Sequence, residues 1–245
     1  MTADTPTILA TSGGWRFGRR VDVEFGPLIT YALELAGPAR RPKLCHLGTA
    51  GGDQRWWNAR VSEAGMVAGV EVTHLNLFPM PSVDDMLAHL LDQDVVWVNG
   101  GSVAGLLAMW RLHGLDEIFR TVWQSGVVLG GVSAGSICWH IGGTTDSFGP
   151  DLRAVTDGLA LLPFSNGVHY DSEEQRRPLF QRCIAEGTLP AGYATDDGVG
   201  LLYRGTRMVE ALTEVEGKGA YYVERGPDGN AVETGIEPRL LPRAS

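Results

Sequence analysis

The stretch "GVVLGGVSAG" (126–135) is an apolar run that ends in a serine between glycines. Three other apolar runs also end in glycines: "TILATSGG" (7–14), "KLCHLGTAGG" (43–52) and "DVVWVNGG" (94–101). Each predicts a buried parallel strand, because its apolar character is nearly continuous and rich in β-branched residues. The segment "GVEVTHLNLF" (69–78) predicts one more strand.

Helical patterns separate these strands. Apolar residues recur at helical spacing over 25–37, 83–93, 102–114 and 115–126. Strands that alternate with helices form βαβ units, in which helices cover both faces of a parallel sheet. The sequence therefore predicts an α/β fold with three layers, α/β/α, around a mostly parallel central sheet.

The pattern changes after residue 150. The segments 192–214 and 218–235 read as antiparallel hairpins, with turn sequences at 204–205 and 227–229. No linker rich in proline or serine separates the two halves of the chain. We therefore expect one domain over residues 1–245, with the C-terminal hairpins extending the same sheet.

Composition restricts the class of partner. The net charge of −9 argues against nucleic acid or an anionic membrane surface. No apolar run is long enough to span a membrane, and the N-terminus lacks the pattern of a signal peptide. The three cysteines are widely spaced and form no C-x-x-C pair, which disfavours a disulfide framework or a zinc site. We expect a cytoplasmic protein without a metal or cofactor.

Ser133 is the candidate nucleophile, since Gly131 to Gly135 spell G-x-S-x-G between a strand and a helix. In a nucleophile elbow this turn projects the serine hydroxyl from the carboxyl edge of the sheet. The N–H of Ala134 is then one donor for an oxyanion, and the loop at Gly100 and Gly101 suits a second. The alternative is a tight strand–helix turn without catalytic function.

A serine hydroxyl needs a base, and His169 in "SNGVHYDSE" is the preferred one because polar residues flank it. His46 stays open, since it lies near the end of a strand. His140 lies about 10 Å along the predicted helix from Ser133, which is too far for a hydrogen bond. The remaining histidines fall within apolar helix or strand patterns: His74, His89 and His113.

The third member of a triad would be a carboxylate that orients the imidazole. Asp146 in "GGTTDSFG" follows the nucleophile segment, and Asp197 in "ATDDGVG" precedes a predicted strand. Asp171 lies only two residues after His169. The residues alone leave the choice among these three open.

Taken in order, "NGGSVAGLL", "GGVSAGS" and "GVHYD" resemble the peptidase E family of serine peptidases, which is related to cyanophycinase. The resemblance runs from about residue 7 to 225 and implies a fold like that of class I glutamine amidotransferases. It implies Ser133 as nucleophile and His169 as base, with the amides of Gly101 and Ala134 forming the oxyanion hole.

The resemblance offers two places for the acid: Asp197, which is preferred because a strand end is rigid, and Asp146. It also implies specificity for an N-terminal aspartate, read by an arginine after the histidine. Here Glu173 occupies that place, so a basic or neutral N-terminal residue is equally compatible. Arg176 and Arg177 are expected on a solvated helix face.

Acidic residues near the site would also suit a free α-amino group. The candidate substrate-binding residues are Gly100, Asp171 and Glu173, with Glu174 close to them. These residues predict a serine-dependent, dipeptidase-like exopeptidase that hydrolyses short peptides through an acyl-enzyme. A homodimer is compatible with the sequence.

Two alternatives remain. One is an inactive amidotransferase-like protein that binds a ligand. The other is an α/β-hydrolase esterase, which shares G-x-S-x-G but usually takes its histidine from near the C-terminus, whereas no histidine follows His169.

Overall fold

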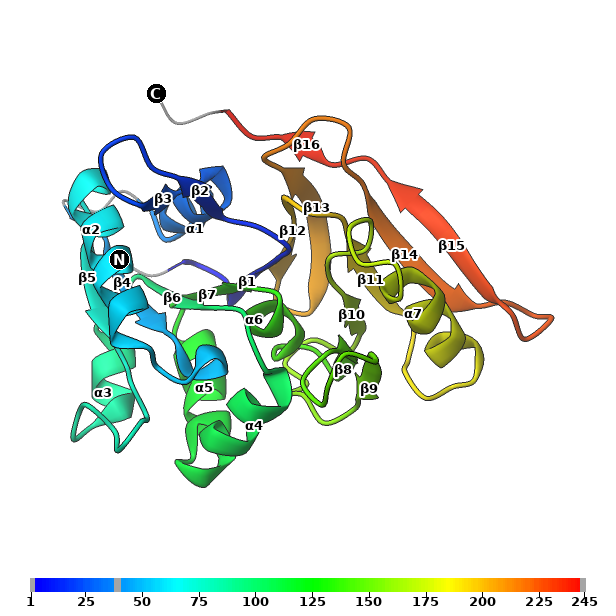
Figure 1. Cartoon of the computed structure of the whole chain (residues 1–245), viewed down its shortest axis with the longest axis horizontal. Coiled ribbons are helices and arrows are strands. Elements are labelled where there is room, and N and C mark those ends of the chain that lie inside the picture. The colour runs from blue at the N-terminus through cyan, green and yellow to red at the C-terminus, as the bar shows by residue number, and fades with distance from the viewer. Residues whose placement is uncertain (1–2, 38–40, 243–245) are drawn as a thin grey trace.

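The computed structural model describes residues 3–37 and 41–242, and most of its strands form two β-sheets (Figure 1). The predicted domain bounds of 1–245 include residues outside the described ranges. The larger sheet has eight strands in the order β16-β13-β12-β1-β7-β6-β4-β5. Its strands are β1 (Thr7–Thr11), β4 (Lys43–Leu47), β5 (Glu71–His74), β6 (Val95–Val98), β7 (Val128–Val132), β12 (Val199–Arg204), β13 (Arg207–Thr213) and β16 (Arg239–Leu240).

The central strands of this sheet are parallel, as the sequence predicts. β1, β7, β6, β4 and β5 pair in parallel, and β12 and β13 continue the sheet antiparallel beyond β1. The four apolar runs that end in glycines and the segment 69–78 therefore form five adjacent strands. Their carboxyl ends lie along one edge of the sheet, where ligands bind in open α/β folds.

Helices cover both faces of the large sheet, which makes the predicted three layers. Along β6, Val96 and Val98 pack with α3, α4 and α5, whereas Trp97 packs on the opposite face with α1 and α2. This alternation is the period of two that a strand imposes on its side chains. The helices are α1 (Pro27–Leu35), α2 (Arg55–Ala68), α3 (Met86–Leu91), α4 (Val103–Leu112) and α5 (Leu115–Gln124).

Two local features differ from the sequence prediction. No helix was predicted over α2, because the residues it buries are small or polar as well as apolar: Asn58, Val61, Ala64 and Gly65. The helix after Ser133, α6 (Ala134–Ile137), is a single turn, so His140 lies beyond it rather than on it.

The second sheet has six strands in the order β15-β14-β11-β10-β8-β9. The expectation that both hairpins extend the large sheet is therefore wrong: β12 and β13 do, but β11, β14 and β15 belong to the second sheet. β10, which pairs in parallel with β11, is a short strand of Ser-Asn-Gly that precedes His169. The strands are β8 (Gly142–Thr145), β9 (Arg153–Val155), β10 (Ser165–Gly167), β11 (Gly192–Thr195), β14 (Ala220–Arg225) and β15 (Ala231–Ile236).

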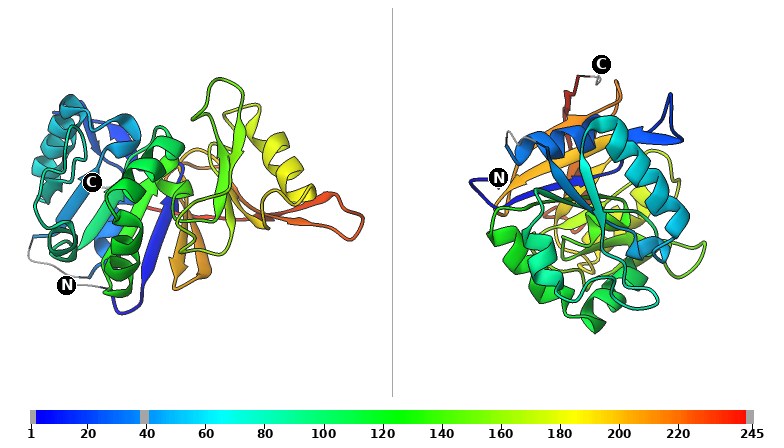
Figure 2. Two further views of the ribbon diagram at one scale, coloured as in Figure 1. Left: turned by 90° about the horizontal axis from the view of Figure 1, so that it is seen from below. Right: turned by 90° about the vertical axis from the view of Figure 1, so that its left-hand side faces the viewer.

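The remaining elements complete the arrangement. β2 (Trp15–Phe17) and β3 (Val23–Phe25) form a small hairpin, and α7 (Arg176–Ala185) packs on the second sheet. Figure 2 shows the β14–β15 hairpin projecting away from the large sheet. Its turn and that between β12 and β13 fall where predicted. Within the described ranges, no helix is long and apolar enough to cross a membrane.

Candidate active site

Ser133 stands at a sharp turn between β7 and α6. Its backbone has φ 57° and ψ −113°, and its N–H donates to the carbonyl of Thr11 at 3.0 Å. The flanking glycines are sterically required: a Cβ on Gly131 would lie 2.5 Å from the carbonyl oxygen of Val98, and one on Gly135 would lie 2.1 Å from it. The Ser133 hydroxyl does not cap α6. The predicted strand–serine–helix elbow is therefore present in this geometry.

The loop between β6 and α4 brings glycines to the serine. A Cβ on Gly100 would lie 3.3 Å from the Cβ of Ser133. Gly101 has φ +137°, and a Cβ there would approach the carbonyl oxygen of Ala50 to 2.3 Å, so only glycine fits. Ala134, the other candidate donor, is the first residue of α6 and is buried.

His169 follows β10 and contacts Asp197. The distance from its Nδ1 to the Asp197 Oδ1 is 2.5 Å, and the two side chains are 23% and 43% exposed. His169 has φ 52°, which is rare for a residue with a side chain. Its Nε2 is the nitrogen left to accept a proton from a serine hydroxyl.

The end of β1 and the residue after it connect the histidine to the serine. Thr11 accepts the Ser133 N–H through its carbonyl, and the next residue, Ser12, accepts the His169 N–H through its hydroxyl oxygen at 3.2 Å. The Ser12 hydroxyl also lies 2.7 Å from that of Thr195, which precedes the Asp197 loop. Ser12 is not among the site residues predicted from the sequence. The signal was its place in "ATSGG", at the glycine-rich end of a strand like that of Ser133.

Asp171 supports the loop of Asp197 rather than contacting the histidine ring. Its carboxylate accepts the backbone N–H of Asp197 at 2.9 Å and pairs with Lys218. Burial alone would raise the pKa of Asp171, but the Lys218 ammonium and the Asp197 N–H outweigh it and lower that pKa. The carboxylate of this candidate substrate-binding residue is therefore already paired with groups of the protein itself.

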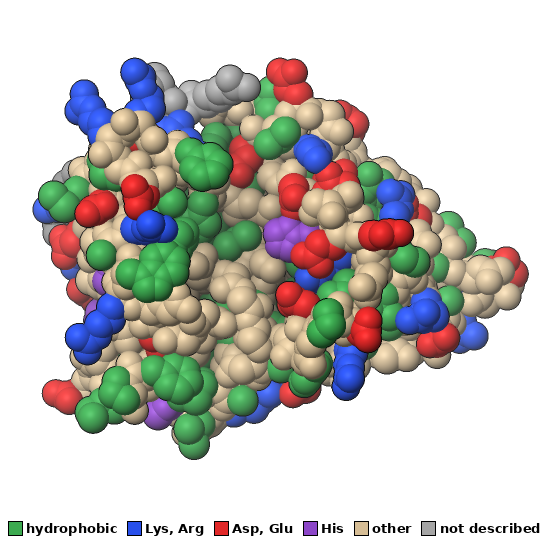
Figure 3. All heavy atoms as spheres, in the orientation of Figure 1, with side chains coloured by type: hydrophobic (Ala, Val, Ile, Leu, Met, Phe, Trp, Pro, Cys, Tyr) green, Lys and Arg blue, Asp and Glu red, His purple; other side chains and the backbone are tan. Residues whose placement is uncertain are grey.

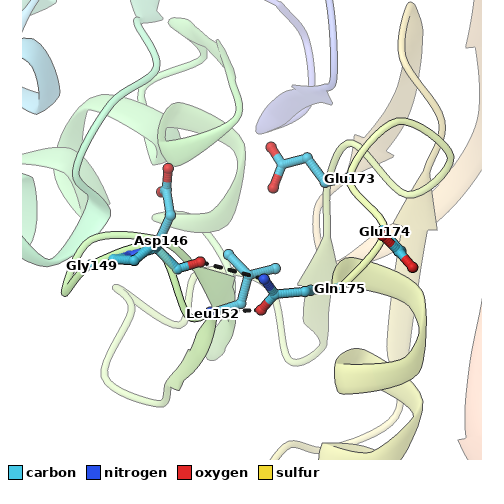
Figure 4. A pocket seen from close by; sticks show the side chains of 7 residues that line it. Asp146, Gly149, Leu152, Glu173, Glu174 and Gln175 are labelled. Carbon is cyan, nitrogen blue, oxygen red and sulfur yellow. Dashed lines mark hydrogen bonds between the residues drawn. The ribbon is translucent and has the colours of Figure 1, made fainter.

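Asp197 is the acid that contacts the His169 ring, whereas Asp146, the other candidate acid, borders a cavity of about 460 Å³. Figure 4 shows Asp146 and Glu173 on opposite sides of this cavity. Gln175 closes its lower part, accepting from the Leu152 N–H at 3.2 Å. The cavity is lined by Asp146, Gly149, Pro150, Leu152, Glu173, Glu174 and Gln175. We refer to it as the acidic cavity.

Of the two arginines of α7 that were expected on a solvated face, Arg177 is exposed as predicted but Arg176 is buried. Arg176 is only 2% exposed; its Nε donates to Glu173 at 2.7 Å and its guanidinium also donates to the carbonyl of Thr144. Arg177 is exposed but lies over the rings of Tyr170 and Tyr221, at 5.1 and 4.7 Å from their centroids. Arg176 therefore holds Glu173 at the edge of the acidic cavity.

Two other histidines, His46 and His140, are buried, whereas His74, His89 and His113 are partly exposed. His46 is fully buried, with its Nδ1 3.3 Å from that of His74. Burial lowers the pKa of His46 to about 3 and that of His74 to about 4. His140 is also fully buried, between the carbonyl of Ser136 and the hydroxyl of Tyr203. These environments favour neutral rings with structural partners.

The face shown in Figure 3 is hollowed between the two sheets. Hydrophobic side chains gather on the side of β2, β3 and α2, and acidic side chains gather on the opposite side, with a histidine at the edge of the hollow. Within the part of the chain that the structure describes, no three histidine, cysteine or acidic side chains are grouped to hold a metal ion.

Comparisons with known proteins identify the family of the chain. The model of Peptidase family S51 matches residues 9–211. The chain is 38% identical over 183 residues to the "Uncharacterized peptidase YgaJ" of Bacillus subtilis (strain 168), which covers 75% of this chain and 78% of that protein.

Two solved structures share the fold. A crystal structure of a peptidase from an acI-B1 Actinobacterium has a TM-score of 0.69 at 14% identity, covering 96% of this chain and 95% of that one. The "Putative Peptidase E Protein" from Listeria monocytogenes EGD-e has a TM-score of 0.60 at 17% identity, covering 84% and 98%. Since the family match spans Ser133, His169 and Asp197 as well as most of the large sheet, the chain belongs to Peptidase family S51.

Proposed function

We propose that this protein is a serine-dependent exopeptidase of the dipeptidase type, with Ser133, His169 and Asp197 as its triad. The observation that carries the proposal is the 2.5 Å contact between Asp197 and His169 Nδ1. The His169 N–H donates to Ser12, and Ser12 directly follows Thr11, whose carbonyl accepts the Ser133 N–H. Family membership favours this function over the esterase alternative.

The proposed reaction is acyl transfer. Ser133 Oγ attacks the scissile carbonyl while His169 Nε2 takes its proton. Asp197 holds the ring and stabilises the imidazolium that forms. The N–H groups of Gly101 and Ala134 stabilise the oxyanion, and His169 then protonates the leaving amine. Water activated by the same histidine releases the acyl group from Ser133.

The acidic cavity supports action on a free N-terminus. Asp146, Glu173 and Glu174 line it, and Arg176 neutralises only part of this charge. A positive α-amino group is attracted there, whereas the side chain of an N-terminal aspartate is repelled. We therefore propose a neutral or basic N-terminal residue in place of aspartate.

Hydrolysis of a dipeptide panel with varied N-terminal residues tests this function. We expect wild type to cleave free dipeptides, and N-acetylated dipeptides to be cleaved much more slowly. Ser133→Ala should keep the fold and lose at least about 10⁴-fold in kcat, as removal of a triad nucleophile does.

Ser125→Ala is the matched control, since this exposed hydroxyl only contacts the carbonyl of Thr121 in its own helix segment. Equal cleavage by wild type and Ser133→Ala would overturn the triad. Peptide binding without hydrolysis by either protein would instead support the amidotransferase-like binding alternative.

A further inference from the structure

A second cavity, of about 220 Å³, lies beside Ser133 on the side away from His169. Gly100 belongs to its lining, and a Cβ on Gly100 would lie 3.3 Å from the Cβ of Ser133, so the cavity borders the proposed reaction site through this residue. None of its described lining residues is charged. They include Gly48, Gly51, Gln54, Trp56, Trp57 and Gly100. We refer to it as the tryptophan cavity.

Aromatic rings form one wall of the tryptophan cavity. Trp56 and Trp57 are adjacent on α2 with ring centroids 5.6 Å apart, and Trp15 packs edge-on to Trp57 at 5.5 Å. The Trp15 indole N–H donates to Asn99, another lining residue, at 3.1 Å. Trp56 is nevertheless 56% exposed. A partly exposed aromatic wall around a neutral cavity is typical of a site for an apolar group.

Sheet order decides which part of a substrate would reach this cavity. β7, which ends one residue before Ser133, lies between β1 and β6. His169 is bound to Ser12 beyond β1, whereas the cavity is built from segments that follow β6 and β4. Since the general acid must reach the leaving amine, the leaving group faces His169. The acyl residue therefore faces the tryptophan cavity.

We propose that the tryptophan cavity binds the side chain of the residue whose carbonyl Ser133 attacks, and that it selects large apolar or aromatic residues there. This inference rests on the proposed peptidase function and specifies its substrate class. It is compatible with the acidic cavity, because the α-amino group and the side chain of an N-terminal residue leave the same carbon in different directions.

The test compares the dipeptides Phe-Ala and Ala-Ala with wild type and Trp56→Ala. We expect wild type to have the higher kcat/KM for Phe-Ala. Trp56→Ala should lower the ratio of the two kcat/KM values about tenfold, mainly through KM for Phe-Ala, because apolar contacts in a pocket discriminate on this scale. Met66→Ala is the matched control: Met66 is an exposed apolar residue of the same helix outside the cavity.

A second variant narrows the cavity instead of widening it. A Cβ on Gly51 meets only the carbonyl oxygen of Gly100, at 4.0 Å, so Gly51→Leu enters open space. It should lower kcat/KM for Phe-Ala more than for Ala-Ala. The isomer Ala-Phe, which places the ring on the leaving side, should not respond to either variant.

The outcomes separate this inference from the proposed function. Serine-dependent cleavage with an unchanged Phe-Ala to Ala-Ala ratio in Trp56→Ala would overturn the tryptophan cavity as the acyl-side subsite. A response of Ala-Phe rather than Phe-Ala would overturn its assignment to the acyl side. Absence of any cleavage that depends on Ser133 would instead overturn the peptidase function itself.

Discussion

Two residues at the site hold backbone conformations that side chains rarely adopt. Ser133 and His169 have φ 57° and 52°, and such strain costs about 1–3 kcal/mol each. Both N–H groups donate to the end of β1 and the residue after it: that of Ser133 to Thr11 and that of His169 to Ser12. These two hydrogen bonds hold both residues in their strained conformations. The conformations in turn determine the directions in which the Ser133 hydroxyl and the His169 imidazole project.

We predict that Asp197 is the acid of the triad. Asp197→Asn should lower kcat for a cleaved dipeptide about 10³- to 10⁴-fold, because a neutral amide neither orients the productive tautomer nor stabilises the imidazolium. The fold should survive, since the Asp197 side chain is 43% exposed. Steady-state kinetics and a thermal melt measure the two effects.

Asp146→Asn provides the comparison. This residue lines the acidic cavity, so its substitution should act mainly on KM and by less than about tenfold. A larger loss of kcat in Asp146→Asn than in Asp197→Asn would make Asp146 the acid, in spite of the Asp197 contact with His169.

Helix α7 depends on one buried arginine. Arg176, in its first turn, connects the helix to Glu173 and to the carbonyl of Thr144 in β8. The sequence "EEQRRPL" suggested a solvated face because charged residues cluster there. The structure buries Arg176 because β8 passes beneath the start of the helix and presents a carbonyl that needs a donor.

Arg176→Met should lower the free energy of unfolding by about 1–3 kcal/mol, since it leaves the buried Thr144 carbonyl without this donor. Urea denaturation measures the change. The control is Arg182→Met on the exposed face of the same helix, for which we expect less than about 0.5 kcal/mol. Equal effects of both substitutions would show that the buried contacts of Arg176 contribute nothing specific.

The site lies where the two sheets meet. The chain crosses from β11 in the second sheet to β12 in the large sheet through Asp196, Asp197 and Gly198. Ser133 comes from the large sheet and His169 from the end of a strand of the second. Packing of the two sheets therefore sets the geometry of the proposed triad.

Buried histidines make stability depend on pH. Burial lowers the pKa of His140 to about 4 in the folded protein, whereas an exposed histidine has a pKa near 6.5. Below about pH 6.5 the unfolded chain binds a proton that folded His140 does not, so stability falls from about pH 6.5 to 4. The free energy of unfolding loses about 3 kcal/mol from this group between pH 6.5 and 4, and loses nothing from it above pH 6.5.

Urea unfolding at several pH values checks this. His140→Gln should flatten the decline relative to wild type by up to about 3 kcal/mol between pH 7 and 4. Parallel curves for wild type and His140→Gln would contradict the prediction.

The sequence by itself determined the parallel strands, most helices of the large sheet and the nucleophile elbow. These features are local: apolar continuity marks a strand buried on both faces, and the steric need for Gly131 and Gly135 is met within one turn. The resemblance carried by these motifs also identified the family that the comparisons confirm.

Only the tertiary structure decided which residues meet across the chain. It placed Asp197 rather than Asp146 against His169, buried Arg176, and brought β11, β14 and β15 into a second sheet with β10. Pairing between strands and contacts between carboxylates and imidazole depend on partners many residues away. Local patterns carry no record of those partners, because any polar residue at a strand end satisfies the same local requirement.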